Sequence, residues 1–159
     1  MSLIPIFASF AIIVSGITCL MLGTQGMFIN RTFLNMPLTV LENSVIDKNK
    51  VETTMEVLRY DDLLTFDELE VEEEKNFYFD KELVKQNVNE YLKLNLKDKI
   101  SSYQIAFKFY EEEDGSFIEN SILEPTGVLI RFRCNYYESF RIDSEMSFYI
   151  EEKEMGSYE

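Results

Sequence analysis

The side chains that could do chemistry in this sequence are mainly carboxylates, because histidine is absent. Histidine is the commonest general base at neutral pH and the commonest transition-metal ligand. Among the 29 Asp and Glu residues, no spacing singles out the carboxylate pair of a glycoside hydrolase. Motifs of nucleotide-binding, zinc-protease, serine-hydrolase and CxxC sites are absent too. We therefore expect a non-enzymatic protein with no catalytic, cofactor-binding or metal-binding residues.

Carboxylates are densest in "DDLLTFDELEVEEE", from Asp61 to Glu74, which holds eight acidic residues and no basic one. The spacing does not match an EF-hand calcium loop, and apolar residues interrupt it. We expect a solvated acidic loop or strand edge.

The two cysteines lie in different settings. Cys19 belongs to an apolar run, whereas Cys134 belongs to an expected strand, so we expect no disulfide between them. Because Cys134 falls on the apolar side of its strand, we expect a buried, unreactive thiol there.

Charge is confined to one part of the chain. The net charge is −14, yet the first charged residue is Arg31. The part beyond residue 30 is therefore a strongly acidic domain, whose field repels phosphate backbones and anionic lipid surfaces. We expect no nucleic-acid partner, and a cationic partner or simple solubility fits this charge better.

The opening segment predicts a single transmembrane helix. The twenty residues from Leu3 to Leu22 carry no charge, and a helix of that length spans about 30 Å, the thickness of the hydrocarbon core. Pro5 is tolerated because it falls in the first turn. The alternatives are a buried core helix or a cleaved signal, but a signal prefers a basic start and a shorter apolar run.

Four small residues recur at every fourth position of this segment: Ala11, Ser15, Cys19 and Gly23. That spacing places them on one stripe of a helix, and small residues let a second helix approach closely in lipid. We expect this stripe to be a helix-packing interface. Small residues are common in the segment, so composition alone could also produce the stripe.

Three regions are expected along the chain: a transmembrane helix at 1–30, a helical stalk at 31–50, and an acidic α+β globular domain at 51–159. The stalk is predicted from Leu34, Leu38, Leu41 and Val45, which form one helical face that Pro37 would kink or restart.

Within the globular domain, the hydrophobic period changes from helix to strand. Asp80 is a plausible N-cap for an amphipathic helix from Asp80 to Lys99. Its apolar face is expected to hold Val84, Val88, Tyr91, Leu92 and Asn95. Alternating strands follow, with a turn at Asp114–Gly115. The expected fold class is α+β, with the helix packed on an antiparallel β-meander that has one apolar and one polar face.

This layout of an uncharged N-terminal helix, a stalk, a helix and a meander resembles type IV pilin-like proteins, in particular the TadE-like minor pilins of tight-adherence systems. The resemblance implies membrane insertion followed by assembly, with the apolar helix in a filament core and the acidic domain outside. Many members carry a glutamate near the start of the mature helix, and this segment has none.

We expect a single-pass membrane-anchored structural or assembly protein of a surface filament or secretion system. Its expected partners are membrane lipid through the N-terminal helix and other membrane or pilin-like subunits. The rival is a membrane-tethered binding or sensor domain with a passive anchor, and an anchored hydrolase using Asp or Glu is a third alternative. Arg31 weakly favours a cytoplasmic domain, but long domains translocate regardless of charge, and we expect an extracytoplasmic one.

Overall fold

The protein has an α+β fold in which a long apolar N-terminal helix joins an antiparallel sheet. The computed structural model describes residues 4–48, 54–60, 75–97, 99–100, 102–113, 116–118, 124–137 and 140–153. Its elements are α1 (Ile4–Leu34), α2 (Thr39–Glu42), β1 (Val45–Asp47), β2 (Thr54–Tyr60), β3 (Phe77–Phe79), α3 (Lys81–Leu96), β4 (Tyr103–Glu113), β5 (Ser116–Ile118), β6 (Gly127–Tyr137) and β7 (Phe140–Lys153).

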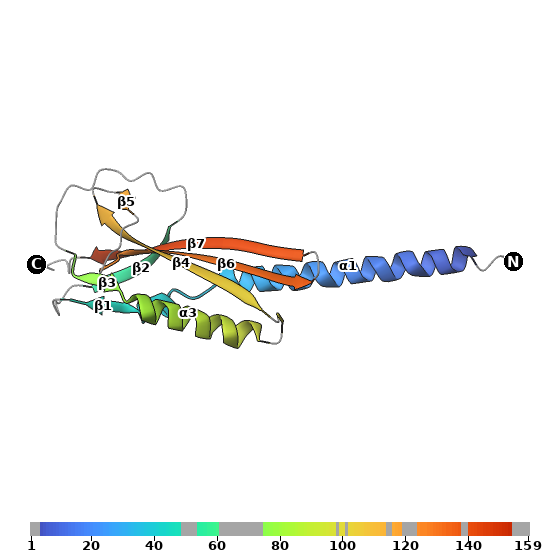
Figure 1. Ribbon diagram of the computed structural model, residues 1–159, viewed down its shortest axis with the longest axis horizontal. Helices are drawn as coiled ribbons and strands as arrows, with labels where there is room; N and C mark the ends of the chain where they lie inside the picture. The colour runs from blue at the N-terminus through green and yellow to red at the C-terminus, as the bar shows by residue number, and fades with distance from the viewer. Residues whose placement is uncertain are drawn as a thin grey trace, which may run out of the picture.

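Helix α1 is longer than the expected span and continues into the domain. Pro5 lies in its first turn, as predicted, and the helix ends at Leu34, ahead of Pro37. Proline lacks an N–H and disfavours helical geometry in the residue before it, so the helix ends before Pro37 and a new helix begins beyond it. The region expected to be a helical stalk therefore holds the end of α1, the one-turn helix α2 and strand β1. Figure 1 shows α1 projecting from one end of the sheet.

Five strands form the main sheet, in the order β2-β7-β6-β4-β5, and every neighbouring pair is antiparallel. Strands β1 and β3 form a separate two-stranded pair. Strands β4 and β5 pair on either side of the expected Asp114–Gly115 turn, which lies outside the described residues.

The predicted alternation of apolar and polar residues is confirmed in β6. Val128, Ile130, Phe132 and Cys134 are buried on one face, while Arg131 is exposed on the other. The helices cover the apolar face and the polar face meets solvent, as one-sided antiparallel sheets commonly do.

Helix α3 packs into the core beneath the sheet. The Asp80 side chain accepts hydrogen bonds from the backbone N–H groups of Glu82 and Leu83, so its predicted N-cap role is confirmed. The fully buried positions are Val84, Val88, Leu92 and Leu96. The prediction that Asn95 lies on this face is wrong, because Asn95 is exposed and Tyr91 is only half-buried. Leu96 ends the buried stripe instead, since it continues the i, i+4 spacing from Leu92.

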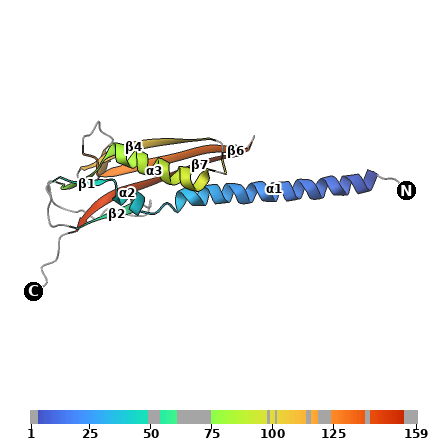
Figure 2. The ribbon, with the colours of Figure 1, turned by 90° about the horizontal axis from the view of Figure 1, so that it is seen from below.

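The second half of α1 is part of the same core. Ile29 and Phe33 are fully buried, and the Phe33 ring stacks on Phe132 of β6 with 5.1 Å between ring centroids. Residues 5–20, by contrast, are all exposed. Figure 2 shows this division, with α3 and the strands alongside only the later part of α1. One helix therefore serves as a core element and as a free projection.

Three polar contacts hold α1 against its neighbours. Ser144 Oγ donates to Asn30 Oδ1 at 2.5 Å, and Tyr91 Oη donates to the Thr32 carbonyl at 3.0 Å. Gln25 Nε2 donates to the Lys99 carbonyl at 2.8 Å. Each such bond contributes about 1 kcal/mol, and together they set the rotation of α1 about its own axis relative to β7 and α3.

Replacing Phe33 with alanine should destabilise the domain, because the ring is fully buried against Phe132. We expect Phe33→Ala to lower the free energy of unfolding by about 3–5 kcal/mol, as for other buried aromatic truncations. The measurement is urea unfolding of the full chain in detergent. The matched control is Phe28→Ala on the same helix, where the side chain is 48% exposed. Equal losses for the two variants would contradict a core role for α1.

Candidate functional site

The candidate functional surface is one face of α1. Residues along this face follow alternating steps of four and three: Ser15, Cys19, Leu22, Gly26, Ile29 and Phe33. This spacing keeps side chains on one side of a helix, as in a coiled-coil seam. The helix face that packs into the domain therefore continues along the same side of α1 towards the N-terminus.

The covered part of this face begins at Leu22. Leu22 is half-buried and Gly26 is buried, whereas Ser15 and Cys19 are exposed. Two further small residues, Ala11 and Gly23, are also exposed, and a Cβ built on Gly23 would meet nothing within 4 Å. The structure thus places the predicted stripe of Ala11, Ser15, Cys19 and Gly23 together on one helix, with no element of the described chain packed on it.

The exposed half of α1 is apolar on all sides. Its large exposed residues include Ile6, Phe7, Phe10, Ile12, Ile13, Leu20 and Met21. Residues 5–34 are long and apolar enough to cross a membrane by length and composition, and none of the most apolar stretch is buried. An uncovered apolar surface of this extent marks contact with lipid or with other proteins.

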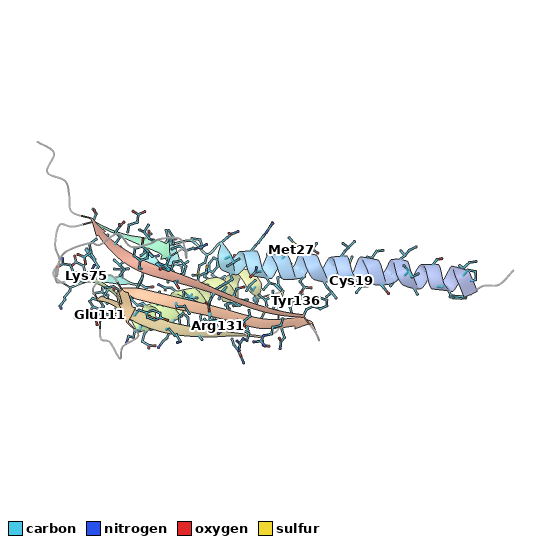
Figure 3. All side chains as sticks on the ribbon, turned by 90° about the horizontal axis from the view of Figure 1, so that it is seen from above. Cys19, Met27, Lys75, Glu111, Arg131 and Tyr136 are labelled. Carbon is cyan, nitrogen blue, oxygen red and sulfur yellow. The ribbon has the colours of Figure 1, made fainter. Side chains whose placement is uncertain are left out.

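The junction between the free and the packed half is made by Gly26 and Tyr136. Tyr136 lies near the end of β6, and its ring and hydroxyl occupy the space where a Gly26 side chain would be. Figure 3 shows Tyr136 beside α1 and Cys19 farther out on the projecting helix. The sequence analysis does not predict this contact. The spacing of Leu22, Gly26 and Ile29 does place Gly26 on the helix face that packs into the domain, where a glycine allows close approach.

A second unpredicted feature is an arginine cluster on the polar face of the sheet. Asp143 of β7 accepts two hydrogen bonds from Arg131, at 2.9 and 3.1 Å, and two from Arg133, at 3.1 and 2.9 Å. Arg141 adds a bond of 3.2 Å. Strand alternation predicts a polar face here, but only the β6–β7 register, in which Arg133 lies opposite Asp143, brings the arginines to one carboxylate.

The arginines perturb the titration of that carboxylate. The hydrogen bond from Arg131, together with that from Arg133 and the charges of both, lowers the pKa of Asp143 to about 2, against a smaller opposing effect of desolvation. The same contact raises the pKa of Arg131. The Asp143 carboxylate is therefore ionised at neutral pH, and three arginines surround it, with Glu145 also acting on Arg131.

The cysteines behave as expected. Both are free; Cys19 is exposed, whereas Cys134 is only 3% exposed. Burial raises the pKa of the Cys134 thiol, so it stays protonated and inert at neutral pH.

Within the described ranges, no group of three or more His, Cys, Asp and Glu residues could hold a metal ion. The acidic run from Asp61 to Glu74 lies outside those ranges. The chemistry that the described surface offers is packing along α1 and ion pairing at the arginine cluster.

Adding one methyl group at two glycines of α1, Gly23 and Gly26, should have different effects. A Cβ on Gly26 would lie 2.7 Å from Tyr136 Cζ and push that ring aside, so Gly26→Ala should be less stable than Gly23→Ala by about 1–3 kcal/mol of unfolding free energy. Gly23→Ala meets open space and should be neutral, or more stable by up to about 1 kcal/mol through helix propensity. Urea unfolding in detergent measures both, and equal shifts would refute the Gly26–Tyr136 contact.

The Asp143 contacts predict a stability contribution that depends on pH. Because the folded-state pKa is depressed from 3.8 to about 2, the contribution is present above pH 3.8 and is lost as the pH falls through 2. NMR titration of the carboxyl carbon should give a midpoint near 2, and Arg131→Gln should raise it towards 3.8. Lys85→Gln, which removes a charge paired with Glu82 instead, should leave the midpoint unchanged.

Comparisons of the chain with family models, with curated proteins and with solved structures give no match.

Proposed function

We propose that this protein is a non-enzymatic, membrane-anchored, pilin-like structural or assembly protein of a surface filament or secretion system. One observation carries the proposal: α1 is a single continuous helix whose first half is apolar and uncovered and whose second half is part of the domain core. In this proposal the first half lies in the membrane and packs against the helices of other subunits.

The rigid junction supports assembly over passive tethering. A tethered binding domain needs only a flexible linker between its anchor and its fold, and such linkers are rich in glycine and serine. Here the helix passes into the core without a break, and Gln25, Asn30 and Thr32 are hydrogen-bonded to the surrounding domain. A helix held this way positions the domain at a set angle to any partner helix, which an ordered filament requires.

The small-residue stripe supports contact between helices. In lipid, close packing replaces the hydrophobic effect as the force between helices, and small side chains allow the closest approach. Ser15 and Cys19 lie in line with the face that already packs on the sheet, so a partner helix would extend that packed seam into the membrane.

The proposed orientation places the acidic domain outside the cytoplasm. Arg31 lies in the last turn of α1, alongside the domain and beyond the uncovered half. By the positive-inside tendency, this single charge weakly favours a cytoplasmic domain. Long domains translocate largely regardless of charge, so Arg31 does not exclude the proposed orientation.

Cysteine cross-linking in membranes tests the helix contact directly. Cys19 is exposed on the stripe and Cys134 is buried, so an oxidant acting on the native chain should join copies through Cys19. We expect a disulfide-linked dimer in membranes, and a several-fold lower yield for Ser15→Leu combined with Gly23→Leu, because leucine keeps the helices apart. Non-reducing gels measure the yield.

Thr24→Leu is the matched control for added bulk. Thr24 follows Ser15 by nine residues, about two and a half turns, and therefore lies on the opposite side of the helix. It should leave the cross-linking yield unchanged. Equal cross-linking yields for all variants would reject the assembly proposal in favour of a tethered domain. The same conclusion would follow if a chain that lacks residues 1–20 kept the full activity of the complete protein.

A further inference from the structure

The arginine cluster opposes the overall charge of the chain. The net charge is −14, yet three arginines surround the carboxylate of Asp143, and with Glu145 opposite Arg131 in the sheet the cluster keeps a local excess of one positive charge. Stability alone does not require this arrangement, because one arginine would satisfy one carboxylate. The arginines therefore form a locally cationic surface on an acidic domain.

The cluster includes guanidinium groups with unused donors. Arg141 donates one hydrogen bond to Asp143, and in the described part of the chain its other N–H groups have no acceptor. Its guanidinium carries five N–H donors in a planar fork that suits the oxygens of a phosphate. The side chains of Arg133 and Arg141 are 39% and 52% exposed, so both are accessible.

A cleft beside these arginines could admit an anionic group. It has a volume of about 490 Å³ and lies at the end of the sheet formed by the start of β4, the end of β6 and the start of β7. Its lining residues are Ser102, Tyr103, Gln104, Arg133, Asn135, Arg141 and the buried Cys134. Amide and hydroxyl groups next to arginines are a set of donors that can surround a phosphate.

The position of the cleft indicates which anion it meets. Arg133 lies three residues, about 10 Å, along β6 from Tyr136, which touches α1 at Gly26. The uncovered apolar half of α1 begins just beyond that contact. Figure 3 shows Tyr136 at the α1 end of the sheet, while Glu111 and Lys75 lie towards the opposite end. The cleft therefore lies on the side of the domain nearest to the surface of a membrane crossed by α1.

Aromatic and basic residues accompany the cleft at this end. Phe140, at the start of β7, is 41% exposed and its ring lies 5.7 Å from that of Tyr136. Lys97 follows the last turn of α3, and Lys99 lies over the ring of Phe28 of α1. Aromatic rings and cations are the side chains enriched at membrane–water interfaces.

We propose that the cleft lined by Arg133 and Arg141 binds the phosphate of an anionic phospholipid and so fixes the tilt of the domain on the membrane surface. This inference rests on the membrane placement in the proposed function. It refines the expectation that the acidic domain repels lipid headgroups: the net charge repels them, while this end of the domain attracts them.

Lipid retention by the full chain tests the proposal. The chain is incorporated into nanodiscs holding equal amounts of phosphatidylglycerol and phosphatidylcholine, and the lipids that remain bound are counted by native mass spectrometry. We expect the wild type to retain phosphatidylglycerol in excess. Arg133→Gln with Arg141→Gln should reduce the excess by about fivefold per charge removed, from the usual attraction of one basic residue to an anionic surface.

Two further variants separate this site from general charge and from misfolding. Lys48→Gln with Lys85→Gln removes the same two charges from pairs with Glu124 and Glu82 and should leave the preference unchanged. Asp143→Asn frees the arginines and should increase it. Because these effects have different signs, loss of folding cannot reproduce the pattern.

Three results would overturn the proposal. The first is no preference for phosphatidylglycerol in the wild type, and the second is equal loss in both double variants. The third is capture of the peptide "DDLLTFDELEVEEE" in place of lipid, which would assign the cleft to a neighbouring copy. Failure of the chain to enter nanodiscs would reject the membrane placement as well, whereas normal entry without a lipid preference would reject this inference alone.

Discussion

The packing of the second half of α1 against the sheet is the contact on which the rest of the structure depends. Phe33 stacks on Phe132 with no exposed surface, and Ile29 is buried one turn earlier. These side chains close the apolar face of β6 and β7, which α3 alone does not cover. The domain therefore cannot be separated from its helix at the end of the uncharged segment, because the helix supplies part of the core.

That shared helix links the proposed assembly role to the fold. A helix that is half core and half projection cannot rotate independently of its domain, since Asn30 and Thr32 accept hydrogen bonds from Ser144 and Tyr91. The exposed stripe around Ser15 therefore has a set direction relative to the sheet. If partner helices pack on that stripe, the spacing and orientation of neighbouring domains follow from it.

The distribution of charge adds a second constraint on orientation. The net charge of the chain is strongly acidic, but the end of the sheet nearest to the free helix carries the arginines around Asp143. A domain with this asymmetry has one end suited to an anionic surface and a remaining surface that stays soluble. Packing along α1 and attraction at the arginine cleft would act together to hold the domain in one pose.

The sequence by itself determined the features that depend on neighbours along the chain. The α+β class, the N-cap at Asp80, most of the apolar face of α3 and the alternation in β6 follow from local period and capping chemistry. The buried thiol of Cys134 follows from the same alternation.

Only the tertiary structure decided which distant residues meet. The uncharged segment does not show where α1 enters the core, because apolar residues suit both lipid and a protein interior. The packing of Phe33 on Phe132 shows where that boundary lies. Likewise, the space beside Gly26 is occupied by the ring of Tyr136, which lies 110 residues later in the chain. The arginine cluster depends on strand register, and a shift of one residue would turn these side chains to the opposite face. Packing and register are relations between remote segments, so no local pattern reveals them.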